Sequence, residues 1–207
     1  SYRFWLHSIM RGLENFRRYD ELNAINKKLE ASLVRDPLTG IYNYNGFLQQ
    51  TEDIIIMSPL RENEKIGALA VDIKNLSKIN NDDGRTAGDR AIISVGKFLE
   101  EVFPGGRIYC IGNGEMVALE VVDSGEDVLN VMEARVKELF AKIDEYNDSL
   151  KEGSRKLEVY YGTAEGMPRT RADYERVVSI ALSRKNGQKL NFQKMNADGF
   201  DKSQMEE

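Results

Sequence analysis

Residues 107–122 read RIYCIGNGEMVALEVV. Two apolar runs, at 108–111 and 116–121, flank the dipeptide Asn113-Gly114. Asn-Gly between apolar runs is a strong hairpin signal, because a tight turn needs residues that tolerate positive φ. We therefore predict an antiparallel hairpin. The alternative is that the glycines of this turn let the backbone approach a phosphate.

Helices and strands alternate on both sides of this hairpin. Apolar periodicity and turn residues predict helices at 44–58, 89–102, 127–150 and 172–184. They predict further strands at 66–73, 157–163 and near 190–192, and a polar loop at 80–88. This order indicates an α/β (or α+β) fold with one mixed sheet of five strands and helices on its faces.

A long helix is predicted ahead of this domain. Residues 4–34 contain no proline, and apolar residues recur there at steps of three and four: Ile9, Leu13, Phe16, Tyr19, Leu22, Ile25 and Leu29. Charged residues occupy the other faces of this helix, so an isolated helix would leave the apolar stripe exposed to water. A partner helix in a coiled coil is one solution, and packing on the chain's own domain is the alternative. Asp36-Pro37 ends the helix.

These boundaries divide the chain into three parts. We predict a helical stalk at 1–35, a domain at 36–193 and a frayed polar tail at 194–207. The chain starts at Ser1 and has no signal-peptide pattern, so we expect it to be a piece of a longer protein.

Composition excludes several classes of protein. The chain has 29 Lys and Arg against 34 Asp and Glu, a net charge of −5 that argues against a nucleic-acid binder. Its uncharged stretches are far shorter than the ~20 apolar residues of a membrane span. Cys110 is the single cysteine, so no internal disulfide forms. We expect a cytoplasmic domain without a membrane segment.

Two polar groups of residues are candidates for a site. Asp72 ends an otherwise apolar strand, where a carboxylate would face the rim of the sheet. Arg184, Lys185 and Lys189 cluster around Gly187 at the end of the last predicted helix. These cations either cap the negative end of the helix dipole or meet phosphates.

Three motifs, taken in order, resemble the GGDEF domains, whose active members are diguanylate cyclases. Residues 36–47 read DPLTGIYNYNGF and resemble the family's D-x-L-T-G-L-x-N-R-x-x-F. Residues 71–89 read VDIKNLSKINNDDGRTAGD and resemble D-x-D-x-F-K-x-I-N-D-x-x-G-H-x-x-G-D. Residues 112–116, GNGEM, stand where the signature itself is expected.

The resemblance implies a sheet wrapped by helices, with the signature on a hairpin. It also implies that the N-terminal helix is a stalk that joins two chains in a homodimer and couples them to an upstream sensor. Active relatives make cyclic di-GMP from two GTP molecules, one held by each domain. Two divalent ions such as Mg²⁺ hold the triphosphate and activate the attacking hydroxyl.

The chain departs from the family at its metal ligands. Asp72 matches the first metal-binding Asp, with the Ile73 carbonyl beside it, but the acidic third position of the signature is Gly114. Glu115 is adjacent, yet neighbouring strand residues point to opposite faces, so it replaces that acid only if the hairpin rearranges. Lys74 replaces the second Asp and disfavours cations nearby. We therefore expect Mg²⁺ binding to be doubtful.

The residues that the family uses to bind phosphate and the inhibitory product are also only partly present. The phosphate-binding Lys and Arg of the family's last helix and loop align with Arg184 and Gln188. The sequence at 103–106 is FPGG, where an inhibitory product site would need R-x-x-D. Product feedback by that route is not expected.

Base recognition is better preserved, because Asn80 and Asp89 match the family's guanine contacts. A carboxylate accepts from the N1–H and N2–H of guanine together, and an amide both donates and accepts. Helix capping and turn formation are the alternative roles of these two residues.

The sequence thus predicts a degenerate, dimeric GGDEF domain that senses GTP or relays a signal. Arg184 and Lys189 are its candidate phosphate contacts. One alternative is a weakly active cyclase in which Glu115 and Asp72 still assemble a metal site. The other is an interaction module that binds no nucleotide.

Overall fold

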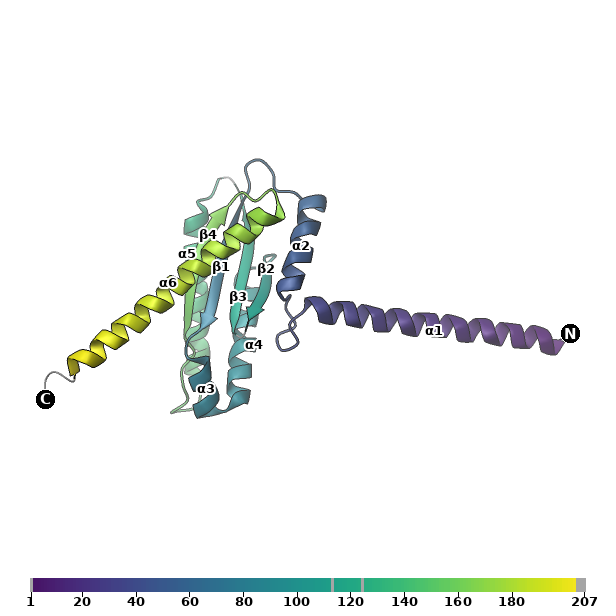
Figure 1. The fold of residues 1–207 in the computed structure, drawn as a ribbon, viewed down its shortest axis with the longest axis horizontal. Helices are drawn as coiled ribbons and strands as arrows, with labels where there is room; N and C mark the ends of the chain where they lie inside the picture. The colour runs from purple at the N-terminus through teal and green to yellow at the C-terminus, as the bar shows by residue number, and fades with distance from the viewer. Residues whose placement is uncertain (1, 113, 124, 204–207) are drawn as a thin grey trace.

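The fold is built on a four-stranded antiparallel sheet (Figure 1). The structure is a computed structural model. It describes the backbone of residues 2–203 apart from 113 and 124, and the side chains of residues 9–30 and 33–191 apart from the same two. The strand order is β2-β3-β1-β4, with β1 Lys65–Ile73, β2 Arg107–Gly112, β3 Glu115–Val122 and β4 Val159–Gly166.

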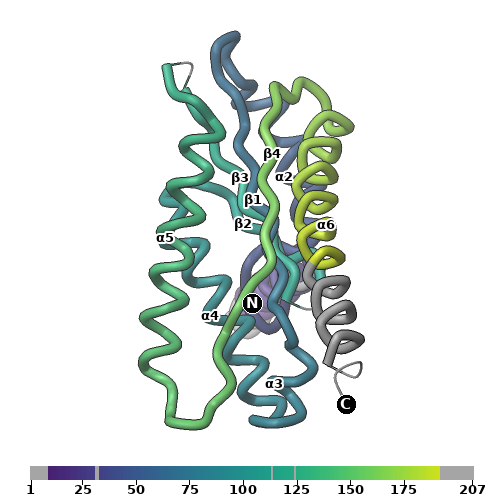
Figure 2. Tube along the Cα trace, turned by 90° about the vertical axis from the view of Figure 1, so that its left-hand side faces the viewer, coloured from purple at the N-terminus to yellow at the C-terminus, as the bar shows by residue number. Residues whose placement is uncertain are grey.

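Strand β1 lies in the middle of the sheet, and its residues alternate between two cores. Leu69, Val71 and Ile73 join a core with helices α4 (Arg85–Val102) and α5 (Val128–Asp148). Ala68 and Ala70 face helices α2 (Tyr44–Met57) and α6 (Arg171–Ser203). Figure 2 shows the resulting layers, with α4 and α5 on one side of the sheet and α2 and α6 on the other.

Helix α6 packs closely on β4 and β1 because small residues line that face. A Cβ added at Gly162 would overlap with the backbone of Lys185 and Ala181 in the helix. Helix and strand therefore approach backbone to backbone, and this contact sets the position of the α6 side chains that point at the sheet.

Helix α1 (Tyr2–Val34) projects away from the domain (Figure 1). The apolar stripe predicted along it is exposed in this single chain: Leu13 is 65% exposed and Phe16 66%. The alternative that the stripe packs on its own domain is therefore wrong for the described side chains of α1. At its end, the Asn43 amide caps α2 and donates to the carbonyls of Leu33 and Arg35, which ties the helix to the domain.

The predicted hairpin, the central strand and the four domain helices are confirmed, but the sheet differs from prediction. Among the described residues the sheet has four strands rather than five, and its three pairings are all antiparallel rather than mixed. Residues 190–192 continue α6 instead of forming a fifth strand. At the outer edge of β4, Gln188 accepts from the N–H of Tyr161 and Arg184 donates to the carbonyl of Thr163. Side chains of α6 thus satisfy groups that a fifth strand would have paired.

Two further segments were also predicted wrongly. The loop expected at 80–88 consists of helix α3 (Leu76–Asp83), a turn at Gly84 with φ +87°, and the first residues of α4. Buried Ile79 anchors α3 despite its polar composition. The polar tail predicted from residue 194 is helical to Ser203, and residues 204–207 lie outside the described part of the chain.

None of the helices in the described part of the chain is both long and apolar enough to cross a bilayer.

Candidate functional site

Three neighbouring strands place a row of polar side chains at one end of the sheet. Asp72 of β1 lies directly opposite Glu115 of β3 and opposite Tyr160 of β4. Directly opposed residues of antiparallel strands project to the same face. Asp72 and Glu115 are therefore side by side, on the face that α6 covers. The sequence argument that Glu115 would need a rearranged hairpin to join Asp72 is not supported.

Two lysines of α6, one helical turn apart, lie over this row. The Lys185 ammonium contacts a Glu115 carboxylate oxygen and lies 3.9 Å from Asp72 Oδ2. Lys189 donates to the same Asp72 oxygen at 2.9 Å. Lys185 is only 1% exposed, whereas the Lys189 side chain is 43% exposed. Each carboxylate of the row is thus paired with an ammonium group.

The electrostatics of the site are dominated by these pairs. The hydrogen bond to Asp72 raises the pKa of Lys189, which keeps this side chain charged. Burial raises the pKa of Tyr160, so its phenol stays neutral at physiological pH. A third cation, Lys74, lies 4.9 Å from the Tyr160 ring centre. Lys185 and Lys189 therefore balance the two carboxylates, and Lys74 and Glu158 add one charge of each sign near Tyr160.

The two candidate base contacts come from consecutive helices. Asn80 lies in α3, and Asp89 lies in the first turns of α4. The Asn80 amide oxygen sits against Gly88, where a Cβ would overlap with it. Within the described side chains, this buried oxygen has no hydrogen-bond partner. The structure thus brings Asn80 beside the residue that precedes Asp89.

The other predicted residues occupy structural positions around the row. Arg184 and Gln188 serve the outer edge of β4, as described above, and neither contacts the two carboxylates. Ile73 lies next to Asp72 in β1, and its N–H donates to the carbonyl of Gly114 at 3.3 Å. Asn113 of the signature lies outside the described residues.

The residues of this site do not fit a divalent metal. Gly114 has φ +78°, and a Cβ there would lie 3.3 Å from Leu76 and 3.4 Å from Ile73. The turn therefore favours glycine at the position where the family carries an acid. Both remaining carboxylates are already paired with lysines. Across the described residues, no group of three His, Cys, Asp or Glu side chains is placed to hold a metal ion.

Sequence reasoning missed the central residue of the site. Lys185 was grouped with its neighbours as a cap or phosphate contact, but its direction depends on the rotation of α6 about its axis. The spacing of Lys185 and Lys189 was the available signal, because residues four apart share a helix face. Tyr160 was missed because strand register cannot be read from a single sequence.

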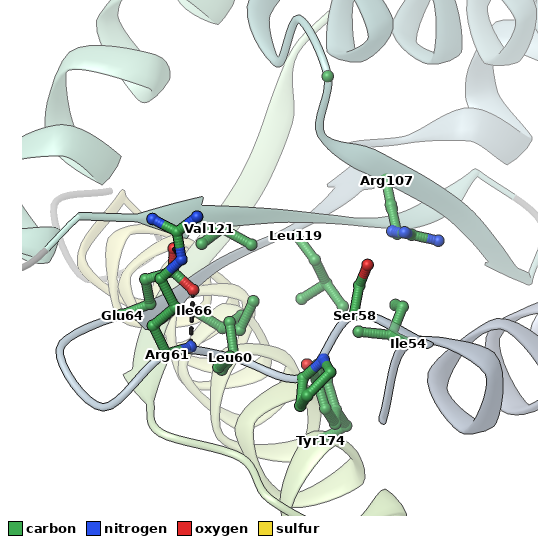
Figure 3. Close-up of a pocket in the computed structure, with 12 residues that line it drawn as sticks. Ile54, Ser58, Leu60, Arg61, Glu64, Ile66, Arg107, Leu119, Val121 and Tyr174 are labelled. Carbon is green, nitrogen blue, oxygen red and sulfur yellow. Dashed lines mark hydrogen bonds and ion pairs between the residues drawn. The ribbon is translucent and has the colours of Figure 1, made fainter. Parts of the chain in front are cut away.

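Two cavities differ in their relation to this row. A cleft of about 610 Å³ borders it, and Lys74, Tyr160 and Gln188 contribute to its lining. Another cavity, of about 430 Å³, lies between the α2–β1 segment, β3 and Tyr174 of α6, with Arg61 and Arg107 on opposite sides (Figure 3). Ile66 in its wall is six residues from Asp72 along β1, about 20 Å. The first cleft thus adjoins the row at Tyr160, and neither Asp72 nor Glu115 is among the residues that line it.

Comparison with protein families identifies the domain. The model described as "Diguanylate cyclase, GGDEF domain" matches residues 33–191. The search among curated proteins found no match.

Several solved structures share the fold. The coiled coil and GGDEF domain of DgcB from Caulobacter crescentus, in complex with c-di-GMP, has a TM-score of 0.67 at 16% identity, covering 86% of this chain and 93% of that one. The diguanylate cyclase SiaD from Pseudomonas aeruginosa, in complex with its activator SiaC, has a TM-score of 0.61 at 17% identity. The match covers 92% of this chain and 71% of that one. The FimX GGDEF domain from Pseudomonas aeruginosa has a TM-score of 0.60 at 18% identity, and the match covers 75% of this chain and 93% of that one.

Proposed function

Because the chain belongs to the GGDEF family of diguanylate cyclase domains, we propose that it is a dimeric module that senses GTP or relays a signal without making cyclic di-GMP. One observation carries this proposal: the Lys185 ammonium lies between Asp72 and Glu115, while Gly114 stands at the acidic position of the signature. Metal-assisted attack on an α-phosphate needs carboxylates that are free to hold cations. Here the carboxylates hold lysines instead.

Retained recognition groups support nucleotide binding. Asn80 and Asp89 keep the residue types and the spacing of the guanine contacts, and the Asn80 amide oxygen has no hydrogen-bond partner among the described side chains. Lys189 is exposed enough to meet a phosphate, and Lys74 lies close by on the Tyr160 ring. The bordering cleft has the volume of a typical small-molecule site.

The exposed stripe of α1 supports the relay part of the proposal. Its apolar residues are solvent-exposed in one chain, and burying them against a second copy would stabilise a parallel helical pair. A stalk that joins two domains can pass a change of helix orientation from an upstream sensor to both of them. An activator protein is named for SiaD, which has a similar fold.

Calorimetric titration with GTP tests nucleotide sensing. We expect the protein to bind GTP and the Asp89→Ala variant to bind at least about tenfold more weakly, because a charged hydrogen-bonding partner of the base is lost. Asp53→Ala, on the exposed face of α2, is the matched control and should bind like the unmodified chain.

The same mixtures are then analysed for cyclic di-GMP. Product in the unmodified chain would refute the proposal and favour the weakly active cyclase. Absence of GTP binding would instead favour an interaction module that uses only the stalk and the domain surface.

A further inference from the structure

The buried ammonium of Lys185 is the strongest unexplained feature of the molecule. We propose that Lys185 is a built-in cation that takes the place of a divalent ion between Asp72 and Glu115, so that this end of the sheet neither needs nor accepts metal. The proposal concerns the apo domain, and it predicts how the domain responds to metal ions whether or not it binds a nucleotide.

Burial makes the pairing obligatory. The Lys185 side chain is 2% exposed, and its charged partners are the carboxylates of Glu115 and Asp72. An ammonium group taken out of water is costly unless opposite charges compensate it. Two carboxylates facing each other across β1 and β3 also repel unless a cation lies between them. Lys185 meets both requirements with a single charge.

The backbone holds this cation in place. Helix α6 contacts β4 at Gly162, where the strand leaves no room for a Cβ against the Lys185 backbone itself. The lysine therefore starts from a fixed point directly above the sheet. A divalent ion between the carboxylates would have to push the ammonium out of its charged surroundings into the apolar contacts between α6 and the sheet.

The charge balance also disfavours metal. Asp72 and Glu115 carry two negative charges, and Lys185 and Lys189 neutralise both. With both carboxylates paired, little negative charge remains to attract a divalent cation.

One consequence rests on the proposed function. If the domain binds GTP, the phosphates meet lysines rather than metal ions, so the affinity should be the same with magnesium as with a chelator. A magnesium requirement would contradict the built-in cation, whereas a lack of GTP binding under both conditions would contradict only the proposed function.

The direct test is titration of the apo protein with Mn²⁺, followed by electron paramagnetic resonance of the free ion. We expect the unmodified chain to bind no Mn²⁺ at this site. Lys185→Met removes the charge and keeps most of the length of the side chain, so it should gain one Mn²⁺ site, with an affinity at least about tenfold above any residual binding of the unmodified chain. A site of similar affinity in the unmodified chain, or no gain in the variant, would overturn the proposal.

Two lysine controls make the test specific. Lys189→Met frees Asp72 on its exposed side but leaves Lys185 between the carboxylates, so it should gain no Mn²⁺ site. Lys97→Met removes an exposed charge from α4 and controls for net charge. If Lys185→Met does not fold, Lys185→Gln keeps a donor for Glu115 and is expected to show the same gain.

Discussion

Gly114 is the residue at which this domain departs most sharply from the acidic signature, and its backbone explains why the departure is not a simple loss. Its φ of +78° lies in the left-handed region, and Leu76 and Ile73 fill the space beside it. The hairpin has adapted to glycine. Restoring the acid alone would therefore strain the turn before it could add a ligand.

We predict that Gly114→Glu lowers the free energy of unfolding by about 1–2 kcal/mol, because a side chain at positive φ is strained. We also expect the variant to make no cyclic di-GMP, since Lys185 still lies between Asp72 and Glu115. Urea denaturation and nucleotide analysis measure the two effects.

Gly112→Ala is the matched control within the same signature. The nearest atom to its added Cβ would be Glu115 Oε2 at 3.9 Å, so the stability should change by less than about 0.5 kcal/mol. Product formation by Gly114→Glu would show that one acid suffices and that the lysines do not block the site.

At the scale of elements, α6 has two tasks that a sequence pattern does not separate. It covers the sheet with apolar residues such as Val178 and Ala181, and it delivers Lys185 and Lys189 to the carboxylate row. Its close approach to β4 depends on Gly162. This glycine therefore links the packing of the helix to the geometry of the site.

We predict that Gly162→Ala destabilises the domain by about 1–3 kcal/mol, because the new methyl group overlaps with helix backbone rather than with a movable side chain. Chemical denaturation measures the change. Gly187→Ala is the control on the same helix: its Cβ meets no atom within 4 Å, and alanine suits a helix interior better. That variant should gain about 0.5–1 kcal/mol. Equal effects of the two substitutions would mean that α6 can shift away from β4 freely.

Elements with a strong periodic pattern could be predicted from the sequence, and those defined by tertiary contacts could not. The hairpin around Gly114 and the strand ending at Ile73 follow from local residue types. Helix α3 was missed because its Asn and Asp residues are typical of loops, while a single buried residue, Ile79, anchors it. The fifth strand was expected where α6 continues, because nothing local marks that Gln188 and Arg184 already occupy the edge of β4.

For the site, the residues could be predicted from the sequence, but their arrangement in space could not. Asp72, Glu115 and Lys189 were recognised as residues, but their meeting point was not, because it depends on the register of three strands and on the rotation of α6. The sequence predicts that Mg²⁺ binding is doubtful, and that prediction stays untested. The structure adds a buried lysine that contacts or approaches the same carboxylates.

At the scale of the whole molecule, helix α1 projects away from the rest of the domain (Figure 1). The junction is short and specific, because the Asn43 amide joins the end of α1 to the start of α2. Under the proposed function, a rotation of α1 would reach the domain at this junction. This role requires a partner helix that covers the exposed apolar stripe of α1.

We predict that the chain dimerises through α1 and that Leu13→Glu weakens the dimer by at least about 2 kcal/mol, roughly 30-fold in Kd, because a carboxylate would be buried in an apolar seam. Leu13 is 65% exposed in the single chain, so the substitution should leave the fold of the domain unchanged. Sedimentation velocity over a range of concentrations measures the association. Arg11→Glu introduces the same side chain at a position that is not three or four residues from any residue of the stripe, and this variant should still dimerise. If both variants associate like the unmodified chain, the stripe is not the interface, and the signal must reach the domain by another surface.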